Sequence, residues 1–437
     1  MTISAPPRRV CSVSATALPR EVSAPPPARS LRIAFITPEF VTESSRDGGL
    51  ANFVNRLTQA LLACGHQPDV FTLSKQQPTE IDFGGVRVYR TWPRRHPPLR
   101  RLSQWLSRLH WRLRFPLPLP RTHHYVYGAL ALGELFNRWD RVHRYDLVHT
   151  SDYGMAGLFV PHSDDRVHVA RSSSTSDLFP RVLGRPRSID LRVIAALERR
   201  CLRRADVAYA PSETTARHYA DRHRLRLNVV RPPFLLEARP AAEVPADVPP
   251  RYMLHFGTLG PIKGTDWLAA TLPHVWAQEP EFALVLAGKE ADPGLVASWR
   301  KQWGTHAGRV FWLGSLRKPD LYAVLRGAVA TILPSRCDNF PNTALESLAL
   351  GVPVIGTNGA SLDELVEPGG SGELVPVDDV PALADVLLRA WRGEVPWVGA
   401  GFRPPRILEE TRPELAVARL LELARVGQRS GAVTAGI

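Results

Sequence analysis

Cysteine is scarce in this chain. The 437 residues include only four cysteines, and no two of them have the Cys-x-x-Cys spacing typical of zinc or redox sites. They are Cys11, Cys64, Cys201 and Cys337. Thiols so far apart in sequence are typical of reduced cysteines in a cytosol. The sequence therefore predicts neither a zinc centre nor a redox centre.

Long apolar runs are also missing. No uninterrupted stretch reaches the ~18 residues that a membrane-spanning helix requires, and the first residues lack the apolar core of a secretory signal. We therefore expect no transmembrane helix, no signal peptide and a cytoplasmic location.

Acidic residues are too few to balance the basic ones. Lys and Arg total 55 against 42 for Asp and Glu, which gives a net charge of +13. This surplus favours anionic partners such as nucleotide sugars, phospholipid headgroups, polyprenyl phosphates or nucleic acid. The amino-acid bias of an arginine-rich proteome is an equally good explanation.

The length and the prolines predict how the chain is divided. Single hydrophobic cores stop growing near ~250–300 residues, so 437 residues indicate two domains. Residues 1–30 are rich in Pro, Ala, Ser and Arg and are expected to be a disordered extension. Residues 232–250 contain six prolines and are expected to be the linker between the domains.

The stretch from Pro334 to Val366 is the most informative part of the chain. An apolar run, 328–333, predicts a strand that ends at Pro334. A helix is expected from about Asn342 to Leu350, after Pro341 and before Gly351, because these residues are favoured at helix starts and ends. Another strand should follow. Ligands bind at the carboxyl ends of strands in such sheets.

Two carboxylates and a helix start share this predicted edge. Asp338 lies in the loop and Glu346, eight residues later, on the helix. Their carboxylates are suited to accept hydrogen bonds from two sets of hydroxyl groups on one ligand. An isolated acidic pair would favour an ordinary solvated Glu346, but the neighbouring residues do not. The N–H groups of Asn342, Thr343 and Ala344 would favour an anionic group.

These residues resemble the acidic-pair signature of the GT-B glycosyltransferases, in particular the retaining family 4 group. Glu346 and the following Leu350-Gly351-Val352-Pro353-Val354 match that signature, and Asp338 stands where the family has a first glutamate. The resemblance implies an α/β protein with two Rossmann-like domains facing across a cleft. It places the N-terminal acceptor-side domain at 31–231 and the nucleotide-sugar-binding domain at 251–405. A C-terminal helix at 406–426 is expected to cross back to the first domain.

The start of the second domain is similar to the family's diphosphate loop. Lys263 matches the lysine that reaches the diphosphate, but Thr258 replaces the family arginine. Arg336, beside Asp338, is the candidate to supply the missing charge. The loop ending at Leu316 resembles the place where the family holds the nucleotide base. The resemblance assigns catalysis to Asp338, Glu346 and Lys263.

The first domain carries weaker signals. Gly48 and Gly49 follow the first expected strand and resemble the family's glycine loop, although a glycine pair is usually a plain tight turn. His149 and Arg171 lie at expected strand ends and are the acceptor-side candidates. His149 could equally be a core residue, and Arg171 could meet an anionic acceptor or simply cap a loop.

Residues 92–124 form an unusual insertion with eight arginines and no acidic residue. Leucines at helical spacing and nearby tryptophans predict a basic amphipathic helix over 94–121, suited to peripheral contact at the inner membrane face. A helix packed on the domain with solvated arginines is the alternative.

The sequence thus predicts a retaining glycosyltransferase that moves a sugar from a nucleotide-diphosphate donor to a glycan or lipid-linked acceptor. No cofactor and no metal ion are expected, because the chain has no Asp-x-Asp motif. A catalytically weakened binding protein with the same fold is the alternative. Nucleic-acid binding is not expected, because the basic cluster lacks a recognition module.

Overall fold

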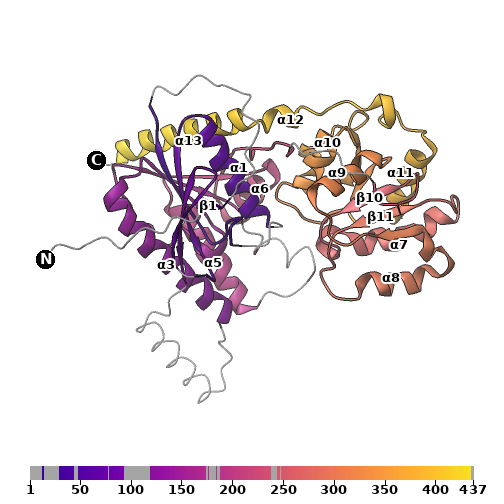
Figure 1. Ribbon diagram of the computed structural model, residues 1–437, viewed down its shortest axis with the longest axis horizontal. Helices are drawn as coiled ribbons and strands as arrows, with labels where there is room; N and C mark the ends of the chain where they lie inside the picture. The colour runs from indigo at the N-terminus through magenta and orange to yellow at the C-terminus, as the bar shows by residue number, and fades with distance from the viewer. Residues whose placement is uncertain are drawn as a thin grey trace, which may run out of the picture.

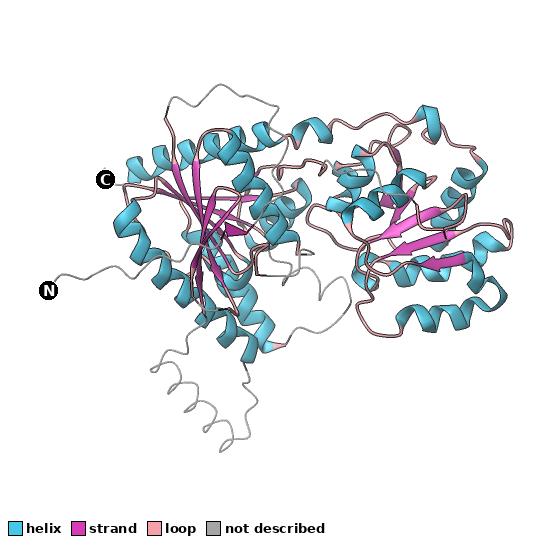
Figure 2. Ribbon diagram, viewed as in Figure 1, coloured by secondary structure: helices cyan, strands magenta, loops and turns pink. Residues whose placement is uncertain are grey.

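The computed structural model describes residues 12–13, 29–43, 48–76, 78–92, 119–173, 176, 184, 188–237, 244–246 and 248–434. It contains two separate sheets, each packed between helices (Figures 1 and 2). Most of the basic segment predicted at 94–121 lies outside the described residues, so its contact with a membrane stays a prediction. Among the described residues, no helix is long and apolar enough to span a membrane.

The first sheet has the strand order β1-β4-β5-β3-β2-β6-β7-β8-β9. Apart from the antiparallel β4–β5 hairpin, neighbouring strands are parallel. Its strands are β1 (Ser12–Val13), β2 (Arg32–Thr37), β3 (Gln67–Leu73), β4 (Glu80–Phe83), β5 (Val86–Thr91), β6 (Leu147–Ser151), β7 (Val167–Arg171), β8 (Val207–Ala210) and β9 (Asn228–Val229). Its helices are α1 (Gly49–Ala63), α3 (Pro120–His143), η1 (Tyr153–Met155), α5 (Ile189–Arg204) and α6 (Glu213–His223).

The second sheet is entirely parallel, in the order β12-β11-β10-β13-β14-β15. Its strands are β10 (Met253–Phe256), β11 (Leu284–Ala287), β12 (Val310–Trp312), β13 (Thr331–Leu333), β14 (Val354–Thr357) and β15 (Gly372–Val375). The helical elements are η2 (Pro261–Lys263), α7 (Thr265–Trp276), α8 (Leu295–Trp303), η3 (Gly304–Arg309), α9 (Lys318–Gly327), α10 (Asn342–Ala349), η4 (Leu362–Glu364), α11 (Val380–Arg392), η5 (Gly399–Gly401), α12 (Ile407–Glu410) and α13 (Pro413–Thr434).

Local sequence explains where several elements begin and end. The β4–β5 hairpin turns at Gly84 and Gly85, which both have positive φ (60° and 84°), a conformation that glycine adopts without strain. Strand β5 lies inside the sheet, between β4 and β3. Pro120, within the predicted 94–121 helix, begins α3, where its missing N–H has no intrahelical partner.

The last helix crosses back to the first sheet, as predicted. In Figure 1, α11 lies on the second domain, whereas the yellow α13 runs along the first. Val417, Leu420, Leu423 and Ala424 are buried in the core that also contains strands β7 and β8. Apolar residues at spacings of three and four place these side chains on one helix face. This packing holds the end of the chain on the first domain.

Replacing Leu420 tests that packing. Leu420 is 1% exposed, so Leu420→Ala should lower the free energy of unfolding by roughly 2–5 kcal/mol, because a cavity remains in the core. Urea unfolding measures the loss. Leu415→Ala is the control on the same helix, since Leu415 is 45% exposed. Equal losses in the two variants would contradict the described packing.

Candidate active site

The loops after β10 and β13 meet at the carboxyl edge of the second sheet. Gly264, at the end of the first loop, has φ 68°, and a Cβ there would lie 1.8 Å from the Pro334 carbonyl oxygen. Only glycine permits so close an approach. The approach brings Lys263 beside Asp338, and their side chains form an ion pair. The structure thus joins two residues that are 75 positions apart in the sequence.

Helix α10 begins beside this pair. Its bounds, Asn342–Ala349, place Asn342 and Thr343 in the first turn and Glu346 one turn later. Glu346 is 3% exposed and forms an ion pair with Lys318, the first residue of α9. Gly257, in the loop after β10, lies against Thr343. Both predicted carboxylates are therefore paired with lysines at the start of one helix.

The first domain also supplies a cation to this place. Arg56, on α1, donates a hydrogen bond from Nη1 to Asn342 Oδ1 at 2.9 Å. Its Nη2 lies 3.8 Å from Glu346 Oε1. Sequence reasoning missed Arg56 and Lys318: nothing in their local sequence distinguishes them from other helix residues. Lys263, Lys318 and Arg56 together provide three positive charges beside two carboxylates.

Arg336 does not supply the free charge that we expected of it. Its Nη1 lies 2.7 Å from Asp266 Oδ1 and its Nη2 2.6 Å from Asp378 Oδ1. Nη1 also donates to the Pro261 carbonyl at 2.6 Å. Burial alone would lower the pKa of Arg336, but these two carboxylates outweigh it and raise the pKa. The guanidinium is already compensated, so it is a poor replacement for the arginine missing at Thr258, which is exposed.

The other predicted donor-side residues lie in the loop after β12 and at the start of α1. Leu316 is half-buried in the loop that follows β12 and packs against the core of the second domain. Gly48 precedes α1, and a Cβ there would lie 3.2 Å from Glu39 Oε2. A Cβ on Gly49 would meet no atom of the described residues within 4 Å.

The two acceptor-side candidates have different surroundings. His149 is 2% exposed, lies 4.9 Å from the Phe35 ring and shares a hydrogen bond with Tyr209 Oη at 2.8 Å. Burial lowers its pKa to about 3, so it is a neutral core residue at physiological pH. His168, on β7, is equally buried, and its pKa is also lowered to about 3, mainly by burial. Arg171 ends β7 and lies over the Phe53 ring.

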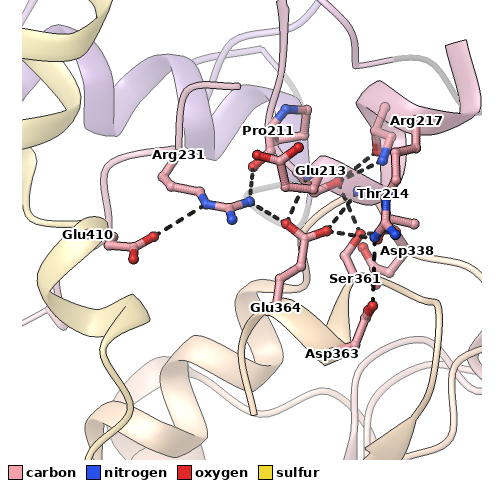
Figure 3. Close-up of polar contacts among 12 residues, drawn as sticks. Pro211, Glu213, Thr214, Arg217, Arg231, Asp338, Ser361, Asp363, Glu364 and Glu410 are labelled. Carbon is pink, nitrogen blue, oxygen red and sulfur yellow. Dashed lines mark hydrogen bonds and ion pairs between the residues drawn. The ribbon is translucent and has the colours of Figure 1, made fainter. Parts of the chain in front are cut away.

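A cluster centred on Glu364 joins the two domains (Figure 3). Its carboxylate accepts hydrogen bonds from the backbone N–H groups of Glu213 and Thr214, both at 2.8 Å, at the start of α6. It also pairs with Arg231 at 2.5 Å. Ser361 Oγ lies 3.1 Å from both Ser212 Oγ and the Asp338 carbonyl oxygen. The cluster therefore connects the loop of Asp338 to the first domain.

No metal site accompanies these residues in the described part of the chain. There, no group of three or more His, Cys, Asp or Glu side chains is arranged to hold a metal ion. The charged groups that are present offer electrostatic interactions: cations and a helix amino end for an anionic group, and carboxylates for hydroxyl groups.

Comparison with known proteins identifies the family. Residues 48–233 match the model of the glycosyl transferase 4-like domain, and residues 250–392 match that of glycosyl transferases group 1. These two segments include the whole second sheet and every strand of the first sheet except β1 and β2. The chain belongs to the GT-B glycosyltransferases. The expected fold class, two Rossmann-like domains with a C-terminal crossover helix, is thereby confirmed.

Individual relatives match different fractions of the sequence of this glycosyltransferase. A lipopolysaccharide core biosynthesis mannosyltransferase, LpsB of Rhizobium meliloti, is 30% identical over 241 residues, which is 52% of this chain and 62% of that protein. The match thus spans less than two thirds of that relative. A glycogen synthase of Mycobacterium tuberculosis is 25% identical over 363 residues, covering 77% of this chain and 81% of that one.

Solved structures support the fold. A sucrose-phosphate synthase from Thermosynechococcus elongatus has a TM-score of 0.62 at 20% identity, covering 93% of this chain and 98% of that one. The apo form of the lipopolysaccharide outer core galactosyltransferase WaaB has a TM-score of 0.60 at 17% identity, covering 90% of this chain and 99% of that one. At these identities the likeness concerns the fold alone.

The Glu364 cluster predicts an acid-sensitive contact between the domains. Burial alone would raise the pKa of Glu364, but hydrogen bonds from Thr214, Glu213 and Arg231 outweigh it and lower the pKa. Because its pKa is lowered, Glu364 stabilises the folded protein fully above the unfolded-state pKa. This stabilisation is lost as the pH falls through the folded-state pKa. The domains should therefore separate below the ordinary glutamate value of about 4.3.

Small-angle X-ray scattering tests this contact. At neutral pH Glu364→Gln should increase the radius of gyration, because it removes charge-assisted hydrogen bonds that contribute roughly 1.5–3 kcal/mol. Glu373→Gln is the control, since Glu373 pairs with Arg389 inside the second domain at 2.6 Å. An unchanged radius in Glu364→Gln, or the same expansion in both variants, would show that Glu364 does not hold the domains together.

Proposed function

We propose that this protein is a retaining, metal-independent glycosyltransferase of the family 4 type. It transfers a sugar from a nucleotide-diphosphate donor to a glycan or lipid-linked acceptor, without a further cofactor. The observation that carries the proposal is the pair of lysine–carboxylate contacts at the start of α10. Relatives named as a lipopolysaccharide core mannosyltransferase and a glycogen synthase support acceptors of these classes.

The charges at α10 suit a diphosphate. Lys263, Lys318 and Arg56 outnumber Asp338 and Glu346 by one positive charge, and the helix start adds a partial positive charge. A diphosphate arriving here would attract the lysines away from their carboxylates. The released carboxylates would then accept hydrogen bonds from the donor's hydroxyl groups. After this exchange the lysines are paired with the diphosphate and the carboxylates are hydrogen-bonded, so no buried charge lacks a partner.

Each residue then has a role in the proposed transfer. Lys263 and the first N–H groups of α10 stabilise the negative charge that develops on the leaving diphosphate. Glu346 holds the ribose, and Asp338 holds hydroxyl groups of the donor sugar. Contact between the two domains excludes water, which would otherwise hydrolyse the donor.

Donor binding tests the assignment of Glu346. A screen of UDP-, GDP-, ADP- and dTDP-sugars should find one donor that raises the melting temperature of the wild type and leaves Glu346→Ala unchanged. Glu279→Ala is the control, because Glu279 pairs with Arg392 at 2.7 Å elsewhere in the same domain. A donor that stabilises Glu346→Ala as much as the wild type would refute the placement. No response to any donor would favour the catalytically weakened alternative.

The stereochemistry and the metal requirement form a separate test. With the donor identified, proton NMR of the first product should show the donor's own anomeric configuration. The transfer rate should be the same with and without EDTA, because cations of the chain itself neutralise the diphosphate. An inverted product, or a rate that EDTA abolishes and a divalent cation restores, would contradict the proposed mechanism.

A further inference from the structure

Arg171 is a buried cation that forms no ion pair with a carboxylate of the described residues, although the charge of Asp152 acts on it electrostatically. It ends β7, is 7% exposed, and its guanidinium carbon lies 3.9 Å from the centre of the Phe53 ring. Nη1 donates to Ser173 Oγ at 2.6 Å, but the buried Nε has no hydrogen-bond partner. Burial lowers the pKa of Arg171, yet arginine stays protonated in proteins.

Two other arginines of the same domain that are largely buried have carboxylate partners. Arg166, just before β7, lies over the Phe136 ring and also pairs with Asp140. Arg90, 10% exposed, pairs with Glu43. A buried charge that lacks such a partner destabilises the protein unless something else compensates it. Retention of Arg171 at the carboxyl edge of the sheet is therefore explained most directly by an anionic ligand.

A second unpartnered group lies close by and comes from the other domain. Asn339 donates from Nδ2 to the Ser173 carbonyl oxygen at 3.2 Å, while its Oδ1 is buried and accepts no hydrogen bond. Asn339 directly follows Asp338. Ser173 thus contacts both Arg171, which has an unused donor, and Asn339, which has an unused acceptor. A ligand with an anionic group and a hydroxyl group would satisfy both.

We propose that Arg171 and Asn339 form a subsite for an anionic sugar, a sugar carboxylate or sugar phosphate, on the acceptor. Arg171 binds the carboxylate or phosphate, and Asn339 Oδ1 accepts a hydrogen bond from a hydroxyl group. The subsite rests on the proposed function, since it lies on the first-domain side of the Asp338 loop. It narrows the acceptor class from any glycan to one with an acidic group near the reacting hydroxyl.

The test compares charged with neutral sugars at equal ionic strength. Glucuronate and glucose 6-phosphate should each raise the melting temperature of the wild type, and glucose should not. In Arg171→Gln the affinity for both anionic sugars should fall at least about 10-fold, because a charge-assisted hydrogen bond is lost. Arg300→Gln, with the same change of net charge on α8, should respond as the wild type does. Equal responses of Arg171→Gln and wild type, or of glucose and glucuronate, would overturn the proposal.

A second variant covers the case in which Arg171→Gln fails to fold. Asn339→Ala leaves the buried arginine untouched and should weaken glucuronate binding, because the hydroxyl group of the sugar loses its acceptor. Undiminished glucuronate affinity in Asn339→Ala would remove Asn339 from the subsite and overturn the proposal as stated.

Glu346→Ala separates this subsite from the donor site. The anionic-sugar response should survive in Glu346→Ala, although nucleotide-sugar binding is lost. Loss of both responses would mean that the anionic sugar occupies the donor site, which overturns the proposal. An Arg171-dependent response in a protein that binds no nucleotide sugar would instead refute the proposed function and leave the anion subsite standing.

Discussion

The carboxylate of Glu364 accepts hydrogen bonds from two backbone N–H groups at the start of α6, and it forms an ion pair with Arg231. A carboxylate at a helix amino end is stabilised by the partial positive charge there. Because Glu364 belongs to the second domain and α6 to the first, this contact sets how the two sheets face each other. The contacts of Arg56 with Asn342 and of Asn339 with Ser173 also join the two domains.

Charge compensation is the second constraint on the site. In the ligand-free protein each predicted carboxylate is paired with a lysine of its own domain, Asp338 with Lys263 and Glu346 with Lys318. Pairing avoids the large cost of leaving a buried charge alone. It also removes the repulsion that two free carboxylates would exert on an anionic donor. The two acids of the site are therefore neutralised by lysines of the chain itself.

Local signals in the sequence were sufficient to predict the helix at the centre of the site. A proline before the helix and a glycine after it predicted α10, which runs from Asn342 to Ala349, and Gly351 has the positive φ of 76° typical of a helix end. The two-domain α/β fold followed from strand and helix patterns together with the family resemblance. These features depend on neighbours in the chain, which is why a single sequence reveals them.

Contacts between distant residues were not predictable in this way. Arg56 and Asn342 are 286 positions apart, and Thr214 and Glu364 are 150 apart. Arg336 was chosen because it is adjacent in sequence to the Asp338 loop, yet its charge is taken by Asp378 and Asp266. Adjacency in the sequence shows which loop carries a side chain. The positions of nearby carboxylates decide which ion pairs that side chain forms.

The arrangement of cations explains how two anionic substrates could be accommodated together. A diphosphate donor and an acidic acceptor repel each other if they share one unscreened site, and the repulsion increases in a region from which water is excluded. Here the cations assigned to the donor in the proposed function surround the start of α10, while Arg171 lies apart at the end of β7 over Phe53. Each anion would then meet its own cation, with the neutral Asn339 amide between them. The fold pairs Arg166, just before β7, with Asp140, whereas Arg171, at the carboxyl end of the same strand, forms no ion pair with a described carboxylate and is the cation that the proposed acidic acceptor would meet.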